Sequence, residues 1–362
     1  MPLIETVGSS SGRGFGFNAG DPFVPFSATF VSLFGSTPSR TAPASLGSYY
    51  NGTQLQGKVT LSSGKQLWTV EKTGLYRIKA YGAQGGRGNF DTEGLVGGGG
   101  ATLQGDFVLT VGEIIQVLCG STGGHRVDLG SNNDGCDSGG GGGTYVVRSP
   151  YNTQQSVLLA AAGGGGAGNR AFYKSPLSSA QGNGDRTNLT INGTVGGAAG
   201  IDGQGGTAGV NGIRSSAGVN GYSGQYRNLG TSNTLDQNGN TNGGNGGGGF
   251  FYDSNSGRTN ETWSSTSYGF AYLDGANGGF SDNANSFGGF GGGGGGHGTC
   301  YISGGGGGGW NGGGNHWQYW NRHGGCGGGS LNNGSNPVNV SGGNYTSSGP
   351  GAFGKVEVLR LS

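Results

Sequence analysis

The sequence predicts an all-β protein, a jelly-roll β-sandwich that carries a long inserted bundle of polyglycine-II helices. Short stretches of alternating apolar and polar residues are typical of half-buried antiparallel strands. Glycine accounts for 93 of the 362 residues and gathers in uninterrupted runs. No window has the pattern of an amphipathic helix, and none holds the roughly eighteen consecutive apolar residues that would indicate a transmembrane span.

Most of the predicted strands lie in the first half of the chain, and one lies at its C-terminal end. The alternation is longest in residues 74–82 and 101–111. Turn residues separate the strands at regular intervals, which is typical of a β-sandwich or jelly roll. The predicted strands are residues 66–70, 74–82, 101–111, 114–118, 144–148, 156–160 and 355–362.

The glycine runs have no side chains with which to build a hydrophobic core, so they are either disordered or packed through their backbones. Disorder is typical of chains rich in glycine and proline, but the charged fraction here is only 10%, too low for self-repulsion to hold the chain open. Polyglycine-II helices have three residues per turn, and their N–H and C=O groups point outward toward neighbouring helices. We therefore expect an ordered lattice formed by residues 97–100, 139–143, 163–166, 246–249, 291–296 and 304–309.

The spacing of the strands predicts three parts. Residues 1–50 contain several phenylalanines but little alternation, and we expect an extended N-terminal attachment arm. Residues 51–162 and 344–362 form the predicted sandwich. Residues 163–343, rich in Gly, Asn and Ser, form the predicted inserted lattice with its aromatic loops.

Residues 66–86 resemble the opening of the glycine-rich domain in receptor ectodomains of the anaplastic-lymphoma-kinase type. Residues 139–146, 158–166, 288–296 and 304–309 fit the same pattern, so the resemblance spans about residues 55–362. It implies a tumour-necrosis-factor-like sandwich with a bundle of polyglycine-II helices, a domain that also occurs in bacterial and viral surface proteins. The chain departs from the receptors in lacking a kinase, a cysteine-rich tail and a signal-peptide pattern. The stretch 8–18 is loosely similar to the starts of phage and virus fibre proteins.

Catalytic and nucleic-acid-binding functions have little support in the sequence. Matches to Gly-x-Gly-x-x-Gly carry no information in a chain so rich in glycine, and no phosphate-binding loop follows a strand. The four histidines and eighteen carboxylates form no familiar catalytic motif. With a net charge of +1 and no basic run, the chain lacks the electrostatic signature of nucleic-acid or anionic-membrane binding. We expect neither an enzyme nor a cofactor.

The four cysteines leave several interpretations open. Cys119 ends a predicted strand and Cys136 lies in the loop beyond it, so a local disulfide between them is one prediction. Cys300 and Cys326 each follow a histidine by three residues, and His297, Cys300, His323 and Cys326 could form a tetrahedral zinc site. A second disulfide or two buried thiols are the alternatives.

Two aromatic loops are the candidate recognition sites. Flat rings beside planar amides and a guanidinium suit the binding of a sugar or a protein hot spot. The alternative is that the rings cap the open ends of the glycine helices. The candidate ligand-binding residues are Trp310, Trp317, Tyr319, Trp320 and Arg322 in one loop and Tyr252 and Trp263 in the other.

These observations together predict a non-enzymatic virion surface protein, a fibre or decoration protein that is located on a virion or an extracellular surface. We expect a homo-oligomer that contacts other structural proteins of a particle and binds a host-surface glycan or protein through its aromatic loops. The alternatives are the ligand-binding ectodomain of a receptor-kinase-like protein and a subunit of an extracellular filament.

Overall fold

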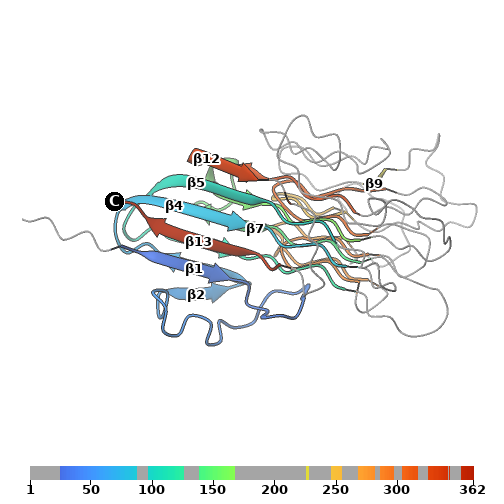
Figure 1. The fold of residues 1–362 in the computed structure, drawn as a ribbon, viewed down its shortest axis with the longest axis horizontal. Coiled ribbons are helices and arrows are strands. Elements are labelled where there is room, and N and C mark those ends of the chain that lie inside the picture. Colours follow the sequence, from blue (N-terminus) through green and yellow to red (C-terminus); the bar gives the residue numbers. More distant parts are fainter. Residues whose placement is uncertain are drawn as a thin grey trace, which may run out of the picture.

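The computed structural model describes residues 25–87, 97–125, 138–167, 226–227, 246–254, 268–281, 286–296, 304–316, 325–340, 342 and 352–362. Two antiparallel sheets form most of the regular structure, which confirms the prediction of an all-β fold (Figure 1). A parallel pair of two-residue strands, β9 (Tyr226–Arg227) and β10 (Asn315–His316), lies apart from them. The described part of the chain has no helix long and apolar enough to cross a membrane.

Sheet 1 has five strands in the order β1-β13-β4-β5-β12, and sheet 2 has six in the order β11-β8-β7-β6-β3-β2. The strands of sheet 1 are β1 (Ser27–Val31), β13 (Lys355–Arg360), β4 (Gly74–Tyr81), β5 (Thr102–Leu109) and β12 (Ser335–Val340). The strands of sheet 2 are β11 (Leu331–Asn332), β8 (Val157–Ala161), β7 (Thr144–Arg148), β6 (Ile114–Leu118), β3 (Lys65–Thr69) and β2 (Val59–Ser62). A 3-10 turn, η1 (Gln154–Ser156), precedes β8 and is closed by a capping box from Thr153.

The two sheets enclose a hydrophobic core that the alternation of their strands creates. In β4, Tyr76, Ile78 and Ala80 point inward and are buried, while the residues between them are partly exposed. Trp68 of β3 and Phe30 of β1 enter the same core from different sheets, with ring centroids 5.9 Å apart. Period-two burial of this kind fixes the register, because a shift by one residue would turn every apolar side chain outward.

The N-terminal boundary of the sandwich differs from the prediction. Residues 25–50 were expected to belong to a separate arm, but Ser27–Val31 pair with Lys355–Leu359 as an edge strand of sheet 1. Phe30 is fully buried in the core, and Tyr50 is buried beside it. The expectation of an arm is therefore wrong for residues 25–50, while residues 1–24 lie outside the described residues.

The boundary of the predicted insertion differs as well. Strands β11 and β12 fall within residues 163–343, yet they pair with β8 and β5 at the edges of the two sheets. Conversely, glycine-rich segments such as 82–87 and 138–143 fall within the predicted sandwich and belong to the glycine-rich part of the molecule. Sandwich and glycine-rich part therefore alternate along the chain.

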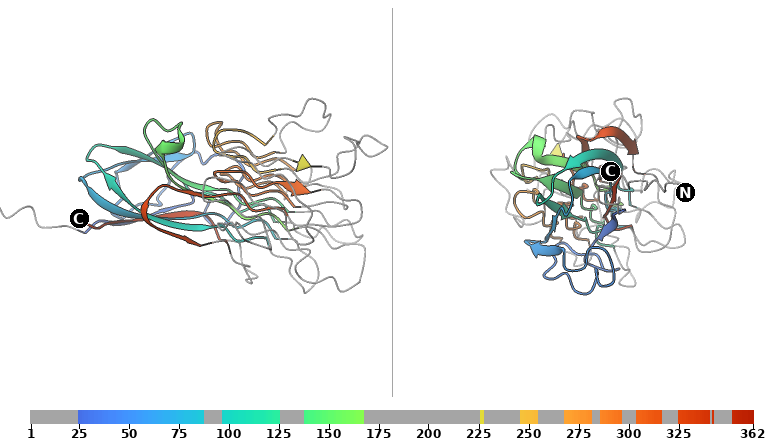
Figure 2. Two further views of the ribbon diagram at one scale, coloured as in Figure 1. Left: turned by 90° about the horizontal axis from the view of Figure 1, so that it is seen from above. Right: turned by 90° about the vertical axis from the view of Figure 1, so that its left-hand side faces the viewer.

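The glycine-rich segments extend the strands beyond one end of the sandwich (Figures 1 and 2). On this side the chain leaves strands β4, β6 and β8. On the same side it enters strands β5, β7, β11 and β13. Further segments between residues 246 and 314 lie among these extensions. We call the whole set the glycine array, and we call the opposite end of the sandwich the platform end.

Backbone hydrogen bonds connect each segment of the array to several neighbours, and the partner changes with a period of three. Along residues 138–143, the amides of Ser138 and Gly141 donate to the segment 164–167. Those of 139 and 142 donate to 121–124, and those of 140 and 143 donate to 291–294. The carbonyl oxygens of the same stretch accept from three further segments, 83–86, 305–308 and 286–290. Six neighbours thus surround one backbone.

Close backbone packing explains why these positions are glycine. A Cβ on Gly164 would lie 1.9 Å from the carbonyl oxygen of Gly98, and one on Gly140 would lie 2.1 Å from that of Gly306. Both obstacles are backbone atoms of neighbouring segments, which cannot move aside as a flexible side chain can. The absence of Cβ atoms therefore allows the segments to approach within hydrogen-bonding distance.

A layer of aromatic side chains joins the array to the outer face of sheet 2. Leu118, Tyr145, Val147 and Val157 on that face pack against rings from the array. Phe250 and Tyr272 are stacked, with ring centroids 4.9 Å apart and planes 10° apart. The aromatic layer consists of Tyr145, Phe250, Tyr272, Phe290 and Trp310, all of them fully buried.

Candidate functional site

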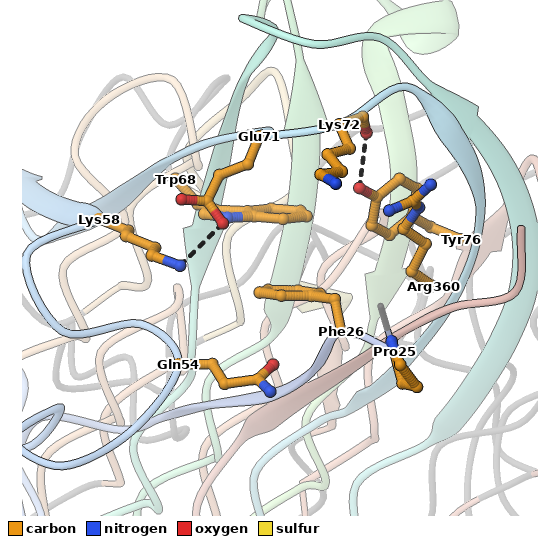
Figure 3. A pocket seen from close by; sticks show the side chains of 9 residues that line it. All are labelled: Pro25, Phe26, Gln54, Lys58, Trp68, Glu71, Lys72, Tyr76 and Arg360. Carbon is orange, nitrogen blue, oxygen red and sulfur yellow. Dashed lines mark hydrogen bonds and ion pairs between the residues drawn. The ribbon is translucent and has the colours of Figure 1, made fainter. Parts of the chain in front are cut away.

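A pocket opens at the platform end of the sandwich, between the ends of the two sheets. Its volume is about 210 Å³, and the side chains around it come from the starts of β1 and β4, the ends of β3 and β13, and the loop before β2. Figure 3 shows the nine lining residues, which are Pro25, Phe26, Gln54, Lys58, Trp68, Glu71, Lys72, Tyr76 and Arg360.

Three aromatic rings form the apolar wall of the pocket. Phe26 stacks on Trp68 with ring centroids 5.4 Å apart and planes 4° apart. Tyr76 meets both rings edge-on, at 6.3 Å from Phe26 and 5.9 Å from Trp68. Parallel and edge-on contacts are the two favourable arrangements of aromatic pairs, so the rings form a stable wall.

Hydrogen bonds hold the aromatic wall in place. The Tyr76 hydroxyl donates to the backbone oxygen of Lys72 at 2.7 Å, and burial raises the pKa of Tyr76 above its ordinary value. Beside the pocket, the Gln54 side chain accepts a bond from the amide of Ser27 at the start of β1. The amide of Arg360 donates to the oxygen of Phe26, which fixes the chain that carries the stacked phenylalanine.

The rim of the pocket is polar and mainly basic. Lys58, Lys72 and Arg360 line it together with one acidic side chain, Glu71. Lys58 and Glu71 form an ion pair at 2.7 Å, drawn as a dashed line in Figure 3. Both side chains are substantially exposed, so this pair contributes little to stability. Trp68 and Tyr76 are almost completely buried, so Phe26 is the ring of this wall that is partly exposed.

The predicted ligand-binding residue Trp310 lies elsewhere, in the aromatic layer beneath sheet 2. Its side chain has no exposed surface, and its ring centroid lies 5.3 Å from that of Phe250. A fully buried ring cannot meet an external ligand, so the role of Trp310 is to pack the array against the sandwich. The alternative interpretation, in which the rings cap the open ends of the glycine helices, stays a prediction.

Tyr252, the other predicted ligand-binding residue within the described ranges, is on the surface with 42% of its area exposed. The Phe251 ring lies between it and Trp310, with centroids at 6.4 Å and 5.4 Å respectively. Tyr252 therefore borders the aromatic layer from outside. The remaining candidate ligand-binding residues lie outside the described residues: Trp263, Trp317, Tyr319, Trp320 and Arg322.

The cysteine predictions fall partly outside the described residues. Cys119 is a free thiol in the core between the sheets, and burial raises its pKa far above the ordinary value. Because this thiol is free, the structure speaks against the predicted disulfide between Cys119 and Cys136; Cys136 itself lies outside the described residues. Cys326 is buried in the array, whereas its predicted zinc-binding companions His297, Cys300 and His323 lie outside the described part.

Within the described ranges, no group of three or more His, Cys, Asp or Glu side chains comes close enough together to hold a metal ion. His125 is the described histidine whose surroundings stand out. Its Nδ1 accepts a hydrogen bond from the amide of Arg87 at 3.2 Å, and its buried Nε2 has no hydrogen-bond partner among the described residues. Burial, with a smaller contribution from the charge of Arg87, lowers the pKa of His125 to about 4.

The platform pocket is the site that sequence reasoning missed. Its residues lie in loops and at strand ends, with Pro25 and Arg360 near opposite ends of the sequence, and no local motif connects them. A comparison with known proteins finds no matching family model and no matching curated protein.

Proposed function

We propose that the protein is a non-enzymatic structural protein of a virion surface, a fibre or decoration protein that works as an oligomer. The observation that carries this proposal is the continuity between sandwich and array, since strands of both sheets run directly into the hydrogen-bonded glycine segments (Figure 1). A body of this kind is elongated and braced along its length. It separates an attachment surface at the platform end from a recognition surface at the far end of the array.

In its finer details, the proposed fold is a jelly-roll sandwich with an array of polyglycine-II helices. The threefold change of hydrogen-bond partner along residues 138–143 supports the helix assignment, because polyglycine-II helices have three residues per turn. Six neighbouring segments around one backbone fit the lateral packing of such helices. The two antiparallel sheets are compatible with jelly-roll connectivity.

Amide hydrogen exchange tests the proposed array. If the segments 286–296 and 304–309 are locked by their neighbours, their amides exchange only through opening of the whole array, and we expect protection comparable to that of strand β4. Exchange within seconds at Gly294, Gly307 and Gly308, whose amides all donate to other segments, would refute the proposed packing.

The proposed location is tested on intact particles. A Fab raised against the folded protein should decorate the surface of purified virions in electron micrographs, and sedimentation of the purified protein should show a homo-oligomer. If the chain is found in no particle and instead in a membrane-anchored receptor, the proposal of a virion protein fails. The same outcome would favour the receptor-ectodomain alternative.

Recognition of a host surface is part of the proposal and rests on the aromatic loops. Before residues 317–324, His316 ends strand β10; after them, Gly325 belongs to the array. Gly325 donates to the oxygen of Gly166, which lies in the glycine segment that continues beyond Ala161, the last residue of β8, and away from the sandwich. Gly325 therefore lies on the side of the molecule that points away from the platform.

A further inference from the structure

We propose that the outer face of sheet 1 is an interface between copies of this chain, so that a second copy of the protein covers it. This inference rests on the proposed function, in which the protein works as an oligomer, and it assigns the surface through which the copies associate. Four properties of the face support this choice of occupant: its exposed aliphatic side chains, its balanced charges, its area and its uncovered position.

The register of sheet 1 places every second residue of its strands on the outer face. In β5, Leu103, Phe107 and Leu109 are buried in the core, so the even-numbered residues of this strand point outward. Residues directly opposite each other on neighbouring strands share a face, and the pairing extends this assignment to the other strands. The outer face consists of Leu75, Arg77, Lys79 and Tyr81 of β4, Thr102, Gln104, Asp106 and Val108 of β5, Val338 and Val340 of β12, Lys355, Glu357 and Leu359 of β13, and Ser27, Thr29 and Val31 of β1.

Four aliphatic side chains meet at the platform end of this face. Leu75 lies directly opposite Val108, and the amide of Leu361 donates to the oxygen of Leu75 at 2.7 Å, so the three residues form a row across neighbouring segments. Leu359 lies two residues before Leu361 and points to the same side. Val108 is 64% exposed and Leu359 is 41% exposed, while the other two are partly exposed. We call these four residues the aliphatic patch.

Exposed aliphatic side chains are concentrated on this face. Val338 and Val340 of the edge strand β12 are 51% and 53% exposed. With Val108 and Leu359, the face carries four of the nine large apolar side chains that are exposed in the described part of the chain. Single exposed apolar residues are common on protein surfaces, but a group of them on one face indicates an interaction site.

The charges of this face are largely balanced within one copy. Arg77 donates two hydrogen bonds to the carboxylate of Asp106, at 2.8 and 2.9 Å, and Lys355 lies 2.7 Å from Glu357. Lys79 is the one further charged side chain among the described residues of the face. Two such faces can therefore meet without strong repulsion, whereas a strongly basic or acidic face would select a partner of the opposite charge.

A second copy suits the aliphatic patch in particular. Most homo-oligomers are symmetric, and in a twofold dimer the same patch of both copies meets at the interface. The aliphatic side chains of one copy then pack against those of the other and are removed from water, which is favourable. The formal net charge of the whole chain, +1, adds little repulsion between copies.

The face is large enough for a specific interface. Sheet 1 has five strands, of which β4 and β5 are eight residues long. With strands about 4.8 Å apart and a rise of about 3.4 Å per residue, its flat area is roughly 500 Å². The relief of the side chains raises the accessible area toward the roughly 800 Å² that each partner of a standard interface buries.

No described segment covers this face. Figure 1 views the sandwich from this side, and strands β13, β4 and β5 lie in front with no described chain across them. On the outer face of sheet 2, by contrast, the aromatic layer covers the apolar residues of β6, β7 and β8. Sheet 1 is therefore the side of the described sandwich that leaves its aliphatic side chains to a partner.

The test measures self-association of the full-length protein by sedimentation equilibrium over a series of concentrations. We expect reversible association. Raising the salt concentration should not weaken it, because salt screens exposed charges but leaves aliphatic contacts intact. A monomer at every concentration would overturn the inference, since a different protein would then have to cover the face.

Two variants and a matched control place the association at the aliphatic patch. Val108→Asp and Leu359→Asp should each raise the dissociation constant at least ten-fold with an unchanged far-UV circular dichroism spectrum, because both side chains are exposed. Val108→Thr keeps the shape of the side chain and should raise it at least two-fold, which tests the patch even if an aspartate variant does not fold. The control is Ile114→Asp. Ile114 is 43% exposed, but it lies on the outer face of sheet 2, since its neighbour Ile115 is in the core, and the dissociation constant should stay unchanged.

Two further results would overturn the inference: association that persists undiminished in Val108→Asp and Leu359→Asp, or an equal loss in Ile114→Asp. In the first case the copies associate through another surface, so the proposed function keeps its oligomer and only this interface is lost. Absence of the chain from particles, which Fab labelling detects, would instead remove the proposed virion function and leave the interface measured in solution unaffected.

Discussion

The hydroxyl of Tyr272 donates a hydrogen bond to Oε1 of Gln116 at 2.7 Å, and so connects the glycine array to strand β6. The ammonium group of Lys65 in β3 lies over the same ring, 4.0 Å from its centroid. Because Tyr272 is fully buried, its ring contributes packing as well as the hydrogen bond. One residue of the inserted region thus contacts two neighbouring strands of sheet 2.

Substitution of Tyr272 should separate these two contributions. Tyr272→Phe keeps the ring stack and loses the hydrogen bond, at a cost of about 1 kcal/mol. Tyr272→Ala also leaves a cavity, and the expected loss is about 3–5 kcal/mol. Urea unfolding measures both, and Tyr252→Ala at the exposed neighbouring site should cost less than about 1 kcal/mol. Equal losses for Tyr272→Phe and Tyr272→Ala would show that the ring does not pack as described.

Alanine in the array should be far more costly than alanine at an open glycine. Gly164→Ala places a Cβ 1.9 Å from a backbone oxygen, so neighbouring segments must separate, and we expect loss of soluble folded protein or a destabilisation of several kcal/mol. The control is Gly57→Ala, where φ is +73° and nothing lies within 4 Å of the new Cβ. Its cost is the left-handed conformation alone, about 1–2 kcal/mol. Similar melting temperatures for the two variants would contradict the close packing.

Stability should fall on acidification because of His125. Its pKa in the folded protein, about 4, lies below the unfolded value of about 6.5, so the unfolded chain binds the proton first as the pH falls. The free energy of unfolding is unaffected by this group above about pH 6.5, decreases between about pH 6.5 and 4, and then levels off. His125→Gln should remove that part of the pH dependence. An unchanged pH profile in this variant would show that other groups cause the loss.

The tryptophans of the aromatic loop should divide into two kinds. Trp310→Ala removes a fully buried ring and should lower stability by about 3–5 kcal/mol. Trp317→Ala and Trp320→Ala should leave the melting temperature unchanged and lower binding to host cells or glycans ten-fold or more, as loss of a hot-spot residue does. Normal binding by both would remove the loop as a recognition site, and unfolding by both would assign their rings to the structure.

Two truncations should distinguish the arm from the sandwich. Removal of residues 1–24 should leave a folded, soluble protein that no longer joins its assembly. Removal of residues 1–50 also deletes β1 and the buried ring of Phe30, so it should unfold the sandwich. Circular dichroism and sedimentation measure the two effects. Normal assembly after the shorter truncation would disprove the role of residues 1–24 in attachment.

Several of the strands that the sequence predicted show clear alternation. The predicted strand 74–82 corresponds to β4 (Gly74–Tyr81), because every second residue enters the core. Strand β12 was missed because all six of its residues are exposed, and it contains a proline and Asn336 at a φ of +49°. An edge strand with no buried face leaves no period-two pattern. Strand β1 was missed because only Ala28 and Phe30 mark its inner face.

The glycine runs predict close backbone packing, but they do not predict which runs are neighbours. Gly141 bonds to Gly164 and Gly308, yet identical residues carry no information about partners. The pairing follows from the strands to which the runs are attached, since β7 and β8 are adjacent in sheet 2 and deliver segments 138–143 and 162–167 side by side. The sequence could not predict the platform pocket either, because Phe26 and Trp68 come together only in the folded sandwich.

The threefold change of partners restricts how the array can vary in length during evolution. An insertion of three glycines in one segment returns every following amide to the neighbour it faced before, one turn further along. An insertion of one or two glycines turns every following amide toward a neighbour other than the one it faced before. We expect homologues of this protein to differ in the lengths of segments such as 138–143 by multiples of three, with other insertions confined to the loops.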